Sequence, residues 1–329
     1  MPSRFRPGRR TALSTLALVV LFGAGCAALA SKERELTFRP VRETSGWFQG
    51  LPQDVREFYL PVSDAPGAER LFTWYWPNEN PEAPTLLYLH GVRWNLTAHL
   101  RRIENLRSFG FSVLAIDYRG FGKSDGELPS EESVYEDAAV AWRWIVARER
   151  DPAKRFVYGH SLGTAVATQL AIGEAARDGL GGLVIEGGFT SLPAMANALA
   201  PSWLPIDWLI TQKFDTVAKI GKVPAPVLIV HGTGDLMVPH RFSEALFAAA
   251  SDPKRLVLVE GGGHYNTSWV GSAEYRQAIA ELFGVPARAA ASIAAPSVKR
   301  GPARSAATMP KPVTSTSAAV ISGAEAALP

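Results

Sequence analysis

Short apolar runs recur along the middle of the chain and are separated by longer amphipathic stretches. The runs contain four to six residues each and are rich in Val, Leu and Ile: Thr85–His90, Phe111–Ile116, Arg155–Tyr158, Gly182–Glu186, Pro226–His231 and Leu256–Glu260. Strands of a parallel sheet are covered on both faces, so they read as continuous apolar runs of this length. The pattern therefore predicts a strand at each run.

The stretches between these runs carry apolar residues at the spacing of helix faces. One face follows the first run and is formed by Leu96, Leu100, Ile103 and Leu106. Another begins after two acidic residues and is formed by Val134, Ala138, Ala141, Trp142 and Ile145. Before these two helical stretches, the pattern of residues 57–76 predicts two extended segments around a turn at 63–67. This alternation predicts an α/β fold with a mostly parallel central sheet flanked by helices.

The first 30 residues have the pattern of an export signal or membrane anchor. Arginines between Arg4 and Arg10 precede an apolar stretch from Thr11 to Ala30, as in a signal peptide. Three outcomes are open: lipidation at Cys26, although no Leu lies three residues before it; cleavage after Ala30; or retention as an anchor of about 20 residues, which is long enough to span a bilayer. We expect membrane association through this segment, with the body outside the cytoplasm at the cell envelope.

The chain changes character again at its other end. Residues 285–329 are rich in Ala, Pro, Ser and Thr and show no apolar periodicity. Such a segment buries too little apolar surface to offset the entropy of ordering, so it is expected to be disordered. Residues 31–284 remain as the body of the chain and are predicted to fold as one domain.

Charge and cysteine content exclude several classes of function. The whole chain carries +3 and each end carries +4, so the body between residues 31 and 284 carries −5. An acidic body gives little support to a nucleic-acid partner. Cys26 is the one cysteine of the sequence, which excludes a disulfide framework and a thiolate metal site. We expect no metal and no cofactor.

The strongest motif is Gly159-His160-Ser161-Leu162-Gly163. It follows the strand ending at Tyr158 and opens a helical run, which is the context of a nucleophile elbow. The turn is tight enough that its flanking positions must be glycine. The serine hydroxyl is lifted above the sheet at a helix N-terminus. We interpret Ser161 as a nucleophile rather than as part of a plain glycine-rich turn.

A serine nucleophile needs a base, and the base needs a carboxylate to orient it. Among six histidines, His264 follows the last strand after a run of three glycines, while His160 is expected to point away from the site. Asp235 follows the preceding strand in a glycine-containing turn. The order Ser161, Asp235, His264 predicts a catalytic triad, with Glu186 as the rival acid.

The tetrahedral intermediate also requires donors for its oxyanion. The N–H of Leu162, just after the nucleophile, is one candidate. The second is expected in the loop after the first apolar run, where His90 and Gly91 make Val92 N–H the donor.

Together these residues resemble the α/β-hydrolase superfamily. The chain is most similar to its small-cap branch, which includes alpha/beta-hydrolase-domain lipases, monoacylglycerol-lipase-like enzymes and serine-aminopeptidase-type domains. The segment Asp117–Ser124 also matches that branch, with Asp117 and Arg119 as braces of the loop. The resemblance spans roughly residues 50–284 and implies an α/β-hydrolase fold with a short helical cap. It departs at Val92, where many relatives carry a polar residue.

The region between the fourth and fifth apolar runs is expected to form the cap. Its apolar residues are Phe189, Met195, Trp203, Leu204, Trp208, Leu209, Ile210 and Phe214. They fit either an apolar acyl pocket or simple packing of the cap onto the body. The sequence thus favours a carboxylic-ester hydrolase that acts on small acyl esters through an acyl-enzyme. The alternatives are a serine aminopeptidase, a lysophospholipase or thioesterase, and a non-catalytic binding protein.

Overall fold

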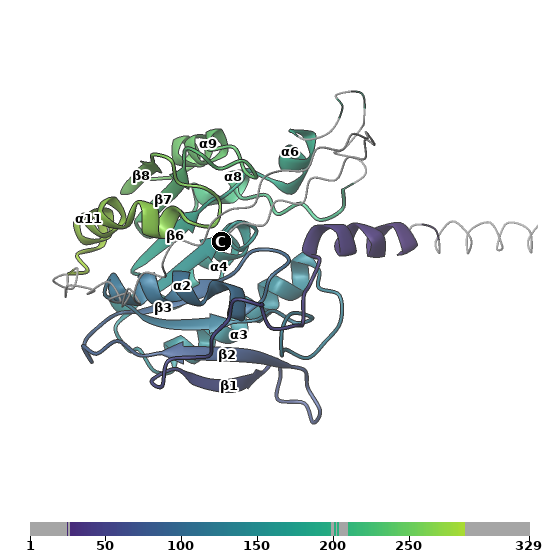
Figure 1. Ribbon diagram of the computed structural model, residues 1–329, viewed down its shortest axis with the longest axis horizontal. Coiled ribbons are helices and arrows are strands. Elements are labelled where there is room, and N and C mark those ends of the chain that lie inside the picture. Colours follow the sequence, from purple (N-terminus) through teal and green to yellow (C-terminus); the bar gives the residue numbers. More distant parts are fainter. Residues whose placement is uncertain (1–24, 26, 199–200, 202, 204–209, 287–329) are drawn as a thin grey trace, which may run out of the picture. The chain divides into compact units, whose positions relative to one another are not determined.

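The computed structural model describes residues 25, 27–198, 201, 203 and 210–286 (Figure 1). The described residues all belong to one compact unit, Met1–Ala289. The second unit, Ala290–Pro329, contains no described residue. The predicted export segment up to residue 24, Cys26 and the tail from 287 onward also lie outside the described residues.

Eight strands form one mixed sheet in the order β1-β2-β4-β3-β5-β6-β7-β8 (Figure 1). They are β1 Arg56–Pro61, β2 Arg70–Trp76, β3 Thr85–Leu89, β4 Ser112–Ile116, β5 Arg155–His160, β6 Gly182–Glu186, β7 Val227–Gly232 and β8 Lys254–Val259. The β1–β2 and β2–β4 pairs are antiparallel and the other pairs are parallel. The predicted strands are confirmed, with ends that move by one or two residues. Parallel strands all end at one edge of the sheet, and this edge receives the candidate site.

The helices occupy the segments between the strands and the segment after β8. They are α2 Leu96–Ser108, α3 Glu131–Val146, α4 Gly163–Ile172, α5 Glu174–Asp178, α6 Leu192–Asn197, α8 Val217–Ile220, α9 Arg241–Ala249, α10 Thr267–Val270 and α11 Ser272–Phe283, with a 3₁₀ turn at Pro152–Lys154. Asn95 caps α2, and Ser130 caps α3 in a capping box, which fixes where both helices begin. Within the described residues, no helix is long and apolar enough to span a membrane.

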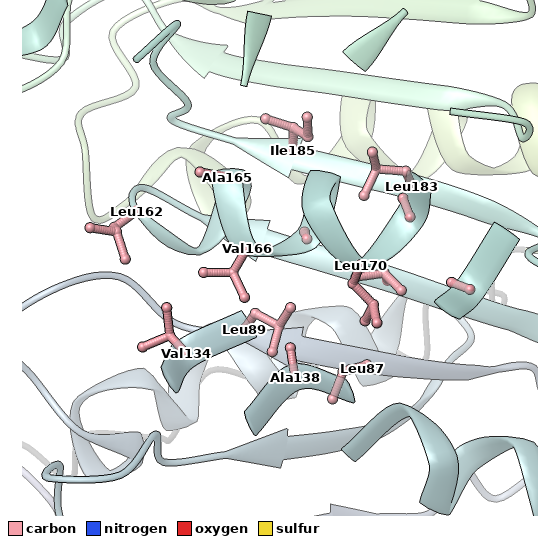
Figure 2. Packing of buried hydrophobic residues seen from close by; sticks show 14 of the residues in the cluster. Leu87, Leu89, Val134, Ala138, Leu162, Ala165, Val166, Leu170, Leu183 and Ile185 are labelled. Atoms are coloured by element: carbon pink, nitrogen blue, oxygen red, sulfur yellow. The ribbon is translucent and has the colours of Figure 1, made fainter. Parts of the chain in front are cut away.

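The sheet separates two apolar layers, as the strand alternation requires. Leu87 and Leu89 of β3 face one layer, which includes residues of α3, α4 and α9. Figure 2 shows this layer, where Val134 and Ala138 of α3 and residues of α4 surround the strand side chains. The intervening Leu86 and Tyr88 face the other layer, formed with α2 and α11.

The segment that precedes β1 is tied into this body. Residues 27–38 are helical, and Phe38 at their end is fully buried. The carbonyl of Phe38 accepts a hydrogen bond from Arg93 N at 2.8 Å. The side-chain amide of Asn95 donates to the carbonyls of Val41 and Glu43 at 3.1 and 2.7 Å. The chain before β1 therefore braces the loop that follows β3.

Candidate active site

Ser161 occupies a sharp turn between β5 and α4, as the motif predicts. Its φ is +54°, a left-handed conformation that costs a non-glycine residue about 1–3 kcal/mol. A β-carbon at Gly159 would clash with the backbone of Gly163, and one at Gly163 would clash with the carbonyl oxygen of Leu89. Both glycines are therefore required by close backbone approach. The backbone N–H of Ser161 donates to the carbonyl of Glu186 at 3.0 Å, which ties the turn to β6.

The structure brings His264 and Asp235 into direct contact. The Nδ1 of His264 lies 2.7 Å from Oδ2 of Asp235, and each of these residues is less than a tenth exposed. Because a carboxylate only accepts, the proton of this bond sits on Nδ1. The Nε2 atom then keeps a lone pair that can accept another proton.

Asp235 is held by a set of further donors. Its Oδ1 accepts the backbone N–H groups of Met237 and Val238, both at 2.8 Å. The Nε2 of His231 lies 3.2 Å from Oδ2. Burial by itself would raise the pKa of the Asp235 carboxyl, but hydrogen bonds from His231, His264 and Val238 outweigh it and lower that pKa below its ordinary value. The carboxylate is therefore ionised at neutral pH.

The loop after β3 passes directly over the serine. A β-carbon on Gly91 would lie only 2.9 Å from the β-carbon of Ser161, so this position has room only for glycine. The buried imidazole of His90 lies 2.6 Å from the carbonyl of Gly91 through Nδ1, and burial lowers the His90 pKa to about 4. A neutral His90 with its proton on Nδ1 thus fixes the loop.

Two backbone N–H groups remain available at this loop and at the elbow. Leu162 is the first residue after the serine and precedes α4 (Figure 2), and Val92 follows Gly91. Within the described part of the chain, neither N–H donates to a protein acceptor. These are the two N–H groups that the sequence predicts as oxyanion donors.

The loop Asp117–Ser124 is braced as expected. Asp117 accepts the backbone N–H of Leu96 at 2.7 Å through Oδ1, which anchors the start of α2. Arg119 donates to Oδ1 of the buried Asp137 at 2.6 Å. These contacts are structural and lie beside the elbow rather than within it.

Two sequence expectations concern side chains beneath His264. His160 was expected to point away from the site, and this is wrong: its Nε2 donates to the backbone carbonyl of His264 at 2.9 Å. The residue just before Ser161 therefore touches His264. The rival acid Glu186 is directed elsewhere, since its carboxylate accepts from Arg102 Nε at 3.1 Å and Tyr158 OH at 2.8 Å.

Sequence reasoning missed Arg102 and His231. Arg102 lies on the buried face of α2 together with His99 and Ile103. A charged residue on an otherwise apolar helix stripe is unusual, and that pattern could have identified it. His231 ends an apolar run, and nothing in its sequence context marks it as a partner of Asp235.

The segment predicted as the cap lies between β6 and β7 and includes α6 and α8. Phe189 and Phe214 are buried, and the ring of Phe214 packs against those of Phe38 and Tyr135, each with a centroid distance of 5.9 Å. These two residues pack this segment onto the body. Trp203 is 79% exposed, whereas Leu204, Trp208 and Leu209 lie outside the described residues.

No group of three or more His, Cys, Asp or Glu residues suited to a metal ion occurs among the described residues. The arrangement at the strand edge instead supplies a strained hydroxyl, an oriented imidazole and two free N–H donors. Together with the sheet topology, these features define an α/β-hydrolase.

The chain belongs to the α/β-hydrolase superfamily, and its residues 80–217 match the model of the family described as serine aminopeptidase S33. An uncharacterized Mycobacterium tuberculosis protein, Rv2307c, is 34% identical over 78% of this chain and 89% of its own length. The lysophosphatidylserine lipase ABHD12 of Danio rerio is 31% identical over 56% of this chain and 51% of its own. The Pyrococcus furiosus esterase Pf2001 superposes with a TM-score of 0.56 at 21% identity, over 74% of this chain and 96% of the esterase.

Proposed function

We propose that this protein is a serine hydrolase that cleaves carboxylic esters, with Ser161 as nucleophile, His264 as base and Asp235 as orienting acid. The observation that carries the proposal is the 2.7 Å contact between His264 Nδ1 and Asp235 Oδ2 beside a serine with φ +54°. A buried Asp–His pair leaves Nε2 able to take a proton, and the elbow presents the hydroxyl that needs to lose one.

In the proposed mechanism, Ser161 Oγ attacks the ester carbonyl carbon while its proton moves to Nε2 of His264. The resulting oxyanion accepts hydrogen bonds from the N–H groups of Leu162 and Val92. The C–O bond then breaks, and His264 gives the proton to the departing alcohol. Water repeats the sequence on the acyl-enzyme, releasing the acid and restoring Ser161. Asp235 stays ionised throughout and stabilises the imidazolium.

Esters are favoured over amides as substrates by the chemistry of the leaving group. An alkoxide departs readily from the tetrahedral intermediate, whereas an amine must be protonated as it leaves and its peptide needs further anchoring. The names of the relatives also support esters as substrates, because one relative is a lysophosphatidylserine lipase and a structural neighbour is an esterase. A lysophospholipase remains the second candidate, and the family description keeps an aminopeptidase as the third.

A fluorophosphonate probe tests the nucleophile. We expect one adduct, on Ser161, found by peptide mapping of the folded wild-type chain. Ser161→Ala should abolish labelling and lower kcat by about 10³-fold or more, because triad residues act as a unit. Ser251→Ala is the matched control, since its exposed hydroxyl bonds only the carbonyl of Gly221. An adduct elsewhere, or none on folded protein, contradicts the assignment.

A p-nitrophenyl ester series from acetate to palmitate, run beside aminoacyl-p-nitroanilides, identifies the substrate class. Each buried methylene contributes about 0.8 kcal/mol, so kcat/KM should rise with acyl length. It should then level off at medium chains, because a short cap limits the groove. Faster anilide turnover would indicate a peptidase. A rate still rising at palmitate would favour the lysophospholipase.

We further propose that residues 1–30 hold the protein at the membrane of the cell envelope, with residues 31–284 as the catalytic domain, 187–222 as its cap and 285–329 as a tail. The support is the basic and apolar pattern of the first 30 residues, whose arginines favour a body outside the cytoplasm. Intact-mass analysis of membrane-extracted protein separates the outcomes. A chain starting at acylated Cys26 indicates lipidation, and one starting at unmodified Ser31 in the soluble fraction contradicts anchoring.

A further inference from the structure

We infer that Arg102 and Glu186 form a buried ionic clamp that sets the position of His264 relative to Ser161, acting as positioning residues of the ester hydrolysis. The inference rests on the proposed function, because it assigns these residues a role in aligning the proposed base and nucleophile. It goes beyond the triad, since neither side chain hydrogen-bonds to the side chain of Ser161, Asp235 or His264.

Glu186 is connected to both halves of the site. Its backbone carbonyl accepts the N–H of Ser161 at 3.0 Å, so it fixes the elbow. Its side chain is buried and accepts from Arg102 Nε at 3.1 Å and from the hydroxyl of Tyr158 at 2.8 Å. The residue that holds the nucleophile's backbone therefore also holds the arginine.

Arg102 extends the connection to the base. Its Nη2 donates to the backbone carbonyl of His264 at 3.3 Å and to that of Tyr265 at 3.1 Å. The guanidinium is almost wholly buried, and its planar fork holds several acceptors in fixed directions. One side chain from α2 thus joins the end of β6 to the loop that carries His264. His160 adds a parallel link, because its Nε2 donates to the same His264 carbonyl.

The loop before His264 explains why such anchors are needed. It begins Gly261-Gly262-Gly263, and Gly261 has φ +68° with no neighbour within 4 Å of where a β-carbon would lie. Glycine runs have high conformational freedom, so the sequence of this loop does not by itself place His264. Hydrogen bonds hold the glycines, because Gly261 N–H donates to Thr233 Oγ1 at 3.0 Å and the carbonyl of Gly262 accepts from Gly234 N–H at 2.9 Å. The Arg102 bonds add a direct hold on the carbonyls of residues 264 and 265.

Stability alone does not account for the pair. Replacing a buried ion pair by apolar residues of similar volume is often neutral or stabilising, because desolvation opposes the Coulombic attraction. The buried guanidinium of Arg102 donates to the backbone carbonyls of His264 and Tyr265, and so it fixes the position of the loop that carries His264. A shift of about 1 Å in a catalytic group can lower turnover about 100-fold, so a clamp on the His264 backbone affects kcat more than substrate binding.

The test uses two variants of the full chain. Arg102→Lys keeps the charge opposite Glu186 but loses the fork. The double variant Arg102→Met/Glu186→Gln removes both charges without leaving one unpaired, and glutamine still accepts from Tyr158. We expect kcat on p-nitrophenyl butyrate to fall about tenfold in the first and about 100-fold in the second, with KM changed less than about twofold. The rate of fluorophosphonate labelling should fall in parallel.

Arg155→Lys is the matched control. Arg155 is also a buried arginine, and it donates to the carbonyls of Glu149, Arg150 and Asp178. It lies at the start of β5, whereas the elbow follows the end of that strand. We expect this variant to lower the melting temperature while kcat stays within about twofold of wild type.

The outcomes separate the clamp from the function. If wild type labels and both Arg102 variants keep kcat within about threefold, or change KM instead of kcat, the clamp is refuted while the triad stands. An equal loss of kcat in Arg155→Lys would also refute it, because the effect would then reflect stability. If the double variant does not fold, Arg102→Lys decides alone. A wild type without labelling refutes the proposed function itself.

Discussion

Asp235→Asn is the substitution for which the structure fixes the expected effect most closely. The Oδ1 atom accepts two backbone N–H groups at 2.8 Å, so the amide oxygen of asparagine will take that place. Its NH₂ group must then occupy the place of Oδ2, which faces Nδ1 of His264 at 2.7 Å and Nε2 of His231 at 3.2 Å. The Nε2 of His231 also lies 2.8 Å from the carbonyl of Val238 and so carries a proton.

A donor in that place reverses the tautomer of the base. His264 must accept from the asparagine through Nδ1, which moves its proton to Nε2 and removes the lone pair that takes the Ser161 proton in the proposed mechanism. The same tautomer change in a serine protease costs about 10⁴-fold in kcat, which corresponds to about 5.5 kcal/mol at 1.36 kcal/mol per tenfold. We expect a loss of about 10³- to 10⁴-fold here.

Stability should change much less than activity. The variant keeps the two backbone bonds and loses one charge-assisted bond, at a cost of about 1.5–3 kcal/mol, against the 5–15 kcal/mol typical of folded domains. The assay is single-turnover acylation with p-nitrophenyl butyrate, beside a thermal melt. Glu186→Gln is the comparison, with a loss expected to stay below about 100-fold because Glu186 acts through Arg102. If Glu186→Gln loses more activity than Asp235→Asn, Asp235 is not the orienting acid.

Three further outcomes follow from particular contacts. Gly91→Ala should lower kcat for ester turnover about 100-fold or more by displacing an oxyanion donor. Gly46→Ala is the control and should leave turnover unchanged, because a β-carbon there meets only open space. Phe214→Ala should cost about 3–5 kcal/mol in urea unfolding, as for buried aromatic side chains, and a cost no larger than that of Trp203→Ala would show that Phe214 does not anchor the cap. Because folding lowers the pKa of Asp235, ionised Asp235 stabilises the fold above about pH 4, and this contribution is lost as the pH falls below that value. The urea midpoint of Asp235→Asn should therefore fall less than that of wild type between about pH 5 and pH 3, and equal falls would contradict the assignment of the shift to this group.

The strand pattern could be predicted because burial on both faces of a sheet leaves a direct record in the sequence. Each apolar run became a strand, and the glycines around Ser161 marked the elbow because no other residue fits there. Helix ends were harder to predict. A single helical run was expected after the elbow, but Gly173 separates α4 from α5.

The sequence by itself determined the order of strands and helices, the position of Ser161, and the pairing of Asp235 with His264 as candidates, since all of these depend on local spacing and chain order. Only the tertiary structure decided which carboxylate faces the imidazole. Glu186 is the last residue of β6 and Asp235 lies just after β7, yet the side chain of Asp235 turns to His264 and that of Glu186 to Arg102. It also decided that His160 reaches under His264, and that Phe38, far away in sequence, supports the loop of Gly91. These contacts join residues separated by tens to more than a hundred positions, so no periodicity records them; they exist only once the sheet has brought the strand ends to one edge.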